Sequence, residues 1–129
     1  NIYINDMTTT SSSSSAFSTE NTKVQMRKGI LEFCILGIIS RGEVYASDIL
    51  DALKSANMLV VEGTVYPLLT RLKNAGLLTY EWKESSSGPP RKYFTLTLEG
   101  QSALEDLKQT WNELSNAVEK ATHFENNNQ

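Results

Sequence analysis

The sequence contains a β-hairpin signal that separates the helical patterns before it from the one after it. The runs "LLTYEWK" (77–83) and "RKYFTLTL" (91–98) are rich in aromatic and β-branched residues, and the turn-forming segment "ESSSGPP" separates them. This arrangement predicts a β-hairpin with a long, stiffened tip. Three helical patterns precede the hairpin and one long helical pattern follows it. The sequence therefore predicts a mainly α fold with a small β-hairpin (α+β).

The first helical pattern, over residues 22–40, is apolar on more than one face. A helix that is apolar nearly all round is buried on two sides, so in so small a domain we expect one side to meet a partner. The single cysteine, Cys34, lies in this run, and we expect it to act as a small buried hydrophobic residue. A "SRG" stop signal ending at Gly42 follows the helix.

The next two helices are predicted from their start signals. Ser47 is the expected N-cap of the second helix, and Asp48 suits the positive end of its dipole. For the third helix, over residues 64–75, we expect Thr64 as N-cap, which places Pro67 in the first turn, where its missing N–H costs little. The spacing i, i+3, i+4, i+7 then gives a core-facing stripe of Val65, Leu68, Leu69 and Leu72.

The last helix is expected to begin near Thr97 and to run to about Phe124. Its apolar residues alternate by three and four, which is a heptad seam of about two and a half repeats. One narrow face of this helix should therefore meet another helix. The seam consists of Leu104, Leu107, Trp111, Leu114, Val118 and Ala121.

The charge distribution is uneven along the chain. The formal net charge is −3, but residues 22–100 hold ten basic and eight acidic residues, so a mildly basic middle lies between acidic ends. One cysteine and one histidine do not make a zinc site, and a lone cysteine fits a reducing, cytoplasmic compartment. We find no catalytic motif, phosphate loop or membrane-spanning run, so we expect neither an enzyme, nor a cofactor, nor a membrane partner.

Three helices followed by a hairpin are the order of a winged helix-turn-helix, in which the helix before the hairpin enters the major groove of DNA. The hydroxyls, amide and cations on the outer face of residues 64–75 can bind base edges and phosphates, and Arg91 and Lys92 can fix phosphates. A merely solvated helix face and a soluble strand edge are the alternatives. The candidate DNA-binding residues are Thr64, Tyr66, Pro67, Thr70, Arg71, Lys73, Asn74, Lys83, Arg91 and Lys92.

These predictions divide the chain into three parts. Residues 1–21 are Ser/Thr-rich and are expected to form a flexible tail; Met7 or Met26 could be the native start, with added sequence before it. Residues 22–98 are the predicted winged helix-turn-helix DNA-binding domain, including the first helix, and residues 99–129 are the predicted C-terminal dimerisation helix and tail.

Two segments together resemble the signature of the PadR family of bacterial transcriptional regulators: "GTVYPLLTRLKNAGLLTYEW" and "GPPRKYFTLTLEG". The opening "RKGILEFCILGII" also fits, and the single last helix resembles the branch of the family with a short C-terminal part. Three positions depart from the pattern. Val65 and Phe94 replace a leucine and a tyrosine, and Ser47 stands where the family tends to have tyrosine.

The resemblance implies a homodimeric repressor of a pseudo-palindromic operator, in which the first and last helices of two subunits pack together. The candidate dimer residues are Ile30, Phe33, Leu104, Leu107, Trp111, Leu114 and Val118. In some short relatives a tryptophan of the last helix stacks on flat hydrophobic ligands, so Trp111 is also a candidate effector-binding residue, although a packed aromatic of the dimer core is the simpler interpretation. The alternative function is a winged-helix protein–protein interaction module without operator binding.

Overall fold

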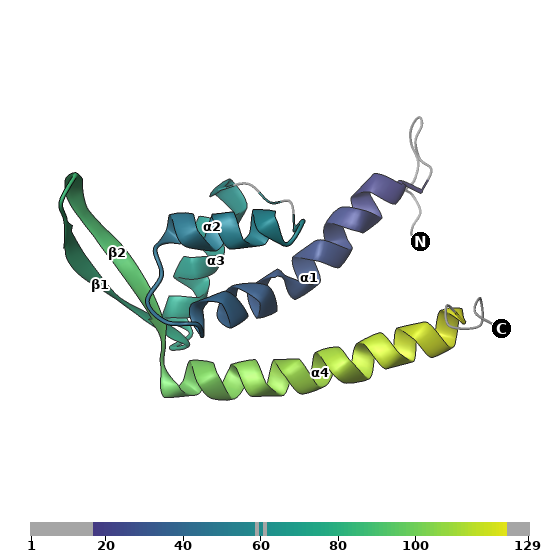
Figure 1. Ribbon diagram of the computed structural model, residues 1–129. Helices are drawn as coiled ribbons and strands as arrows, with labels where there is room; N and C mark the ends of the chain where they lie inside the picture. The colour runs from purple at the N-terminus through teal and green to yellow at the C-terminus, as the bar shows by residue number, and fades with distance from the viewer. Residues whose placement is uncertain (1–16, 59, 61, 124–129) are drawn as a thin grey trace, which may run out of the picture. The chain divides into compact units, whose positions relative to one another are not determined.

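The computed structural model describes residues 17–58, 60 and 62–123 (Figure 1). It divides into two compact units, with the boundary between Ile30 and Leu31, inside the first helix. The elements follow the predicted order of three helices, a hairpin and a long helix. They are α1 (Thr19–Ile39), α2 (Ala46–Ser55), α3 (Glu62–Asn74), β1 (Leu78–Ser85), β2 (Gly88–Leu96) and α4 (Leu98–Thr122).

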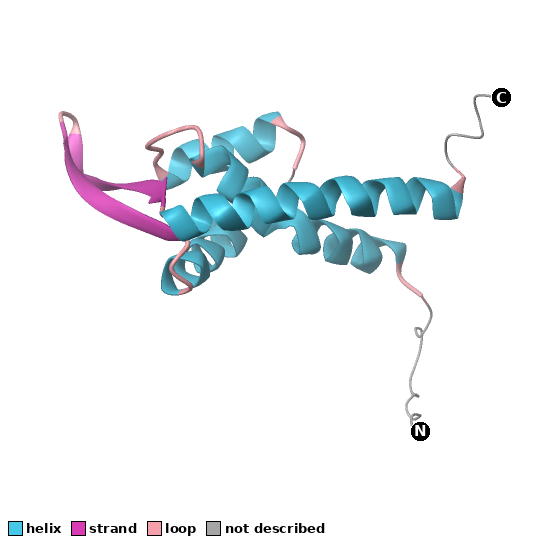
Figure 2. Cartoon of the chain, turned by 90° about the horizontal axis from the view of Figure 1, so that it is seen from below, coloured by secondary structure: helices cyan, strands magenta, loops and turns pink. Residues whose placement is uncertain are grey.

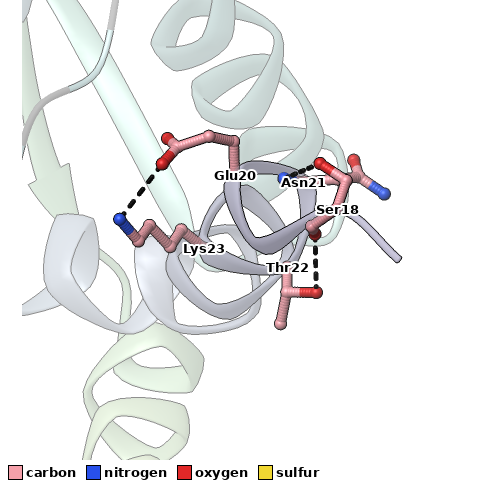
Figure 3. A network of polar contacts seen from close by, with 5 residues as sticks. All are labelled: Ser18, Glu20, Asn21, Thr22 and Lys23. Carbon is pink, nitrogen blue, oxygen red and sulfur yellow. Dashed lines mark hydrogen bonds and ion pairs between the residues drawn. The ribbon is translucent and has the colours of Figure 1, made fainter. Parts of the chain in front are cut away.

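The first unit contains the N-terminal part of α1, which begins three residues before the predicted start at Thr22. Ser18 explains the earlier start, because its Oγ accepts a hydrogen bond from the backbone N–H of Asn21 at 3.1 Å (Figure 3). A serine that satisfies this orphan N–H is a typical N-cap. One turn on, Lys23 lies 3.1 Å from Glu20, an i, i+3 ion pair on the exposed surface.

The second unit has one hydrophobic core. It draws on the C-terminal half of α1, on α2, α3 and both strands, and on the first turns of α4. All of its described fully buried side chains are apolar. The buried residues are Leu31, Ile35, Leu36, Ile38, Ile39, Ile49, Leu53, Val65, Leu69, Leu72, Leu78, Phe94 and Leu104.

The predicted caps of α2 and α3 are both wrong. Tyr45, not Ser47, is the N-cap of α2, and its backbone N–H is satisfied by the Asp48 carboxylate at 2.9 Å. Helix α3 begins at Glu62, so Thr64 is already helical and Pro67 is its sixth residue. Pro67 at this position lacks the N–H for one helical hydrogen bond. Glu62, an acidic residue in the first turn, favours a helix start there.

The hairpin, which we call the wing, extends beyond α2 and α3 (Figure 2). Its strands are antiparallel, with Tyr80 opposite Phe94 and Trp82 opposite Lys92. The expected long tip is wrong: the strands continue into "ESSSGPP", and Ser85 pairs with Gly88 beyond a register shift. Proline is tolerated where a bulge interrupts the ladder, so Pro89 and Pro90 can lie within β2.

The start of α4 is fixed to the end of α3. Thr97 caps α4 by accepting from the N–H of Gly100 at 2.9 Å, and its hydroxyl donates to the carbonyl of Gly76 at 2.6 Å. Gly76 has φ of +84°, a left-handed conformation that suits glycine after a helix. A Cβ on Gly100 would lie only 2.1 Å from the carbonyl oxygen of Leu77, so the two backbones approach as closely as glycine permits.

Candidate nucleic-acid interface

The start of α2, the outer face of α3 and the wing enclose a groove of about 490 Å³. Three lining residues are cations, and the described lining includes no acidic side chain. The groove is therefore a local concentration of positive charge in a chain whose formal net charge is −3. Its lining residues are Tyr45, Ala46, Ser47, Tyr66, Leu69, Thr70, Lys73, Asn74, Tyr80, Arg91, Lys92 and Phe94.

Six of the predicted DNA-binding residues meet in this groove. Helix α3 contributes four and β2 contributes two, from positions far apart in the sequence. They are Tyr66, Thr70, Lys73, Asn74, Arg91 and Lys92. Thr64 and Pro67 are also exposed on α3 but do not line the groove.

Two lysines of the groove lie against aromatic rings. Lys92 Nζ is 4.4 Å from the centroid of the Tyr80 ring and 5.4 Å from that of Trp82. Lys73, from α3, approaches the same Tyr80 ring at 5.6 Å. An ammonium over an aromatic face is attracted by the ring quadrupole. Tyr80 therefore links α3 to the wing through Lys73, while its contact with Lys92 joins the two strands of the wing.

Two further predicted cations are ion-paired within the chain. Arg71 Nε lies 3.3 Å from Glu32 Oε2 of α1, an oxygen that is itself almost inaccessible to solvent. Lys83 Nζ lies 2.6 Å from Glu43 Oε1, ahead of α2. Arg71 and Lys83 therefore each have an acidic partner, and a DNA phosphate would have to displace that carboxylate or share the cation with it.

The α2 side of the groove was missed by sequence reasoning. Ser47 was identified only as a helix cap and as a departure from the family pattern, Tyr80 only as a strand residue, and Tyr45 was not singled out. A side chain's helix or strand position does not reveal which other element it faces.

Two side chains beside the groove, Lys83 and Tyr93, have raised pKa values. The hydrogen bond to Glu43 raises the pKa of Lys83, so the ion pair persists at neutral pH. The hydrogen bond from Tyr93 to the hydroxyl of Tyr45, with burial as a second cause, raises the pKa of Tyr93 and keeps that phenol protonated. Away from the groove, burial raises the pKa of the Cys34 thiol, which fits a packed, unreactive cysteine.

The predicted dimer residues differ in where they lie and in how exposed they are. Leu104 is buried in the core of the single chain, and Phe33 and Leu107 pack partly against that core. Trp111, Leu114 and Val118 lie on one face of α4 and are 42%, 52% and 45% exposed. Ile30 is half-buried at the end of the first unit.

Two structural features of residues 17–58, 60 and 62–123 bear on metal binding and on membrane spanning. These residues hold no group of three or more acidic, histidine or cysteine side chains that could bind a metal ion. None of their helices combines the length and the apolar character needed to cross a membrane.

Solved structures of similar sequence share this arrangement of helices and wing. A PadR-like transcription factor from Bacteroides fragilis is 55% identical, with a TM-score of 0.66 over 78% of this chain and 98% of the other. A PadR-like transcriptional regulator from Bacillus cereus is 42% identical, with a TM-score of 0.68 over 76% and 96%. Bacillus subtilis PadR, solved in complex with operator DNA, is 27% identical, with a TM-score of 0.55 over 60% and 46%. No curated protein matches the sequence.

The fold and the likeness to these structures define a winged helix-turn-helix protein of the transcription-regulator class. The family model of PadR-like transcriptional regulators matches residues 35–106, and the chain belongs to this family. The resemblance inferred from the motifs is confirmed, and so is the expectation that the chain is a regulator rather than an enzyme.

Proposed function

We propose that this chain binds double-stranded operator DNA as a homodimer and represses transcription from it in the cytoplasm. The observation that carries the proposal is the groove between α3 and the wing, in which Lys73, Arg91 and Lys92 converge without an acidic neighbour in the described lining. Cations at a groove edge bind phosphates, while the exposed Thr70 and Asn74 offer groups for base edges. The solved complex of Bacillus subtilis PadR with operator DNA supports the same partner for this chain.

The exposed apolar face of α4 supports the proposed homodimerisation. Trp111, Leu114 and Val118 stand at i, i+3 and i+7, the spacing of a helix–helix seam. A twofold dimer would present two copies of α3 to one side of the DNA, about 34–36 Å apart or a multiple of that spacing. The operator is therefore expected to be pseudo-palindromic.

We further propose that a small-molecule effector releases the protein from DNA. Trp111 is an exposed aromatic ring beside Leu114 on α4, and a flat hydrophobic effector could stack on it. To release DNA, the effector must prefer a dimer in which the two α3 helices are wrongly spaced for the operator. Quenching of tryptophan fluorescence by a candidate effector, lost in Trp111→Phe with dimer mass unchanged, would support this role. Quenching that persists in Trp111→Phe would leave Trp111 as a packing residue.

The first test is fluorescence anisotropy with DNA from upstream of the chain's own gene, against scrambled DNA of equal length, at several salt concentrations. We expect preferential binding to the upstream DNA and a steep loss of affinity with salt. Lys92→Ala should weaken binding to both DNAs and reduce the salt slope by about 0.9, the contribution of one phosphate contact. Lys108→Ala, on the exposed surface of α4, is the matched control and should bind like the parent.

Two results would count against the groove as an operator-binding site. Weak binding to both DNAs, insensitive to salt, would favour the alternative of a protein–protein interaction module. Equal losses in Lys92→Ala and Lys108→Ala would show that overall charge, not the groove, governs the affinity.

A further inference from the structure

Arg91 is held in place by residues of the α2 start. Its Nη2 donates to Ser47 Oγ at 2.8 Å, although the two residues are 44 positions apart in the sequence. The carbon at the centre of its guanidinium lies 3.5 Å from the centroid of the Tyr45 ring. Stacking and a directed hydrogen bond together fix both the plane and the rotation of the guanidinium.

Tyr45 is itself fixed from three sides. Its backbone N–H donates to the Asp48 carboxylate at 2.9 Å, and its hydroxyl accepts a hydrogen bond from Tyr93. Its ring centroid is 4.0 Å from that of Tyr93. The preceding residue, Val44, pairs with Phe94 of β2 through two backbone hydrogen bonds of 3.3 Å and 2.8 Å. The surface on which Arg91 rests is therefore anchored to both α2 and the wing.

We propose that Ser47 and Tyr45 are positioning residues that hold the Arg91 guanidinium at the α2 edge of the groove, ready to bind a DNA phosphate. This rests on the proposed DNA-binding function. Ser47 occupies one donor of a guanidinium that carries several, so other N–H groups stay available to a phosphate. A side chain already held in its binding geometry loses less conformational freedom when the complex forms.

The exposure of the Ser47–Arg91 hydrogen bond distinguishes a positioning role of Ser47 from a purely structural one. Ser47 and Arg91 are both exposed, so removal of the serine hydroxyl leaves no buried polar group without a partner. Stability should therefore change little. The serine should matter only when Arg91 is present and only when DNA is bound.

The test is a double-mutant cycle of Ser47→Ala and Arg91→Ala, read by anisotropy on upstream and scrambled DNA over a salt series. We expect Ser47→Ala to weaken binding to both DNAs by about two- to tenfold, the effect of one hydrogen bond. Because the cation remains, its salt slope should match that of the parent, whereas Arg91→Ala should lower the slope by about 0.9. In the Arg91→Ala background, Ser47→Ala should have no further effect.

Two controls accompany the cycle. Ser47→Thr keeps the hydroxyl and should restore parental affinity, and Ser55→Ala, at the other end of α2, should leave affinity unchanged. The midpoint of thermal unfolding should be the same in all the serine variants.

Additive effects of Ser47→Ala and Arg91→Ala would overturn the positioning role while leaving the DNA-binding function intact. A fall in the unfolding midpoint of Ser47→Ala would overturn it as well, since the serine would then be structural. If the parent chain binds neither DNA, the proposed function fails first, and the positioning role fails with it.

Discussion

Individual cations around the groove are held by neighbouring side chains of the same chain. Lys92 and Lys73 share the Tyr80 ring, Arg91 rests on Tyr45, and Arg71 pairs with Glu32. Lysine and arginine side chains normally carry much rotamer freedom, and contacts of this kind reduce it before any ligand arrives. These cations were all predicted as DNA contacts of the same kind. The structure shows that they differ in the neighbouring side chains that restrict their conformations.

Arg71 is expected to contribute to stability more than the other predicted DNA-binding residues of α3. In Arg71→Ala the nearly inaccessible Glu32 Oε2 loses its ion-pair partner. Glu32 Oε2 has no hydrogen-bond partner among the described residues even with Arg71 present, so Arg71 contributes charge compensation only. Because the Arg71 side chain is 71% exposed, we expect its loss to cost about 1 kcal/mol or less. Urea unfolding measures the change. The double variant with Glu32→Gln should recover part of the loss. Unchanged stability with reduced DNA binding would instead make Arg71 a DNA contact.

Asn74 is expected to discriminate between bases rather than to add general affinity. It lines the groove at the end of α3, and its amide can donate and accept at a base edge. Asn74→Ala should reduce the preference for operator over scrambled DNA by about 1–3 kcal/mol while leaving the salt slope unchanged. Competition binding with both DNAs measures this ratio. An equal loss on both DNAs would assign Asn74 to the phosphate backbone.

Among the elements, the junction of α3, β1 and α4 depends most on close backbone packing. Thr97 bonds both to the start of α4 and to the carbonyl of Gly76, and Gly100 lies against the carbonyl of Leu77. These contacts set the direction in which α4 leaves the wing. Any change in that direction would move the exposed face of α4 relative to the groove.

Gly100→Ala should therefore destabilise the chain, although alanine is normally the better helix former. Its Cβ would stand 2.1 Å from the Leu77 carbonyl oxygen, a rigid backbone atom, so α4 must shift. We expect a loss of about 1–3 kcal/mol in the free energy of unfolding. Gly63→Ala is the matched control, since its Cβ would meet nothing within 4 Å, and it should be neutral or stabilising. A stable Gly100→Ala would show that α4 has room to move.

At the scale of the whole molecule, the proposed dimer would use the exposed seam on α4 as its interface. Leu114→Asp places a charge in the centre of the face formed by Trp111, Leu114 and Val118. Burying an unpaired carboxylate in a helix–helix seam is costly, so we expect a monomer that binds the operator weakly. Sedimentation velocity measures the mass. Asn116→Asp adds the same charge at another exposed position of α4 and should leave the dimer intact. A dimeric Leu114→Asp would place the interface elsewhere.

The sequence alone determined the order and type of the elements, because hydrophobic periodicity and turn formers act over a few residues. It placed Val65, Leu69 and Leu72 on the buried face of α3 and the exposed cations on the other. The sequence motifs also identified the family, which the family model confirms over residues 35–106. The element boundaries were less well predicted, since α3 begins at Glu62, ahead of the expected cap Thr64, and β2 includes Pro89, where local propensity disfavours a strand.

Only the tertiary structure decided which side chains meet. Ser47 and Arg91 are 44 residues apart and touch because the bridge between Val44 and Phe94 fastens the α2 start to β2. Likewise, Leu104 and Trp111 belong to one heptad seam, yet Leu104 is buried in its own chain while Trp111 is exposed. Helical periodicity specifies a face but not what covers it, and that depends on where the rest of the chain packs.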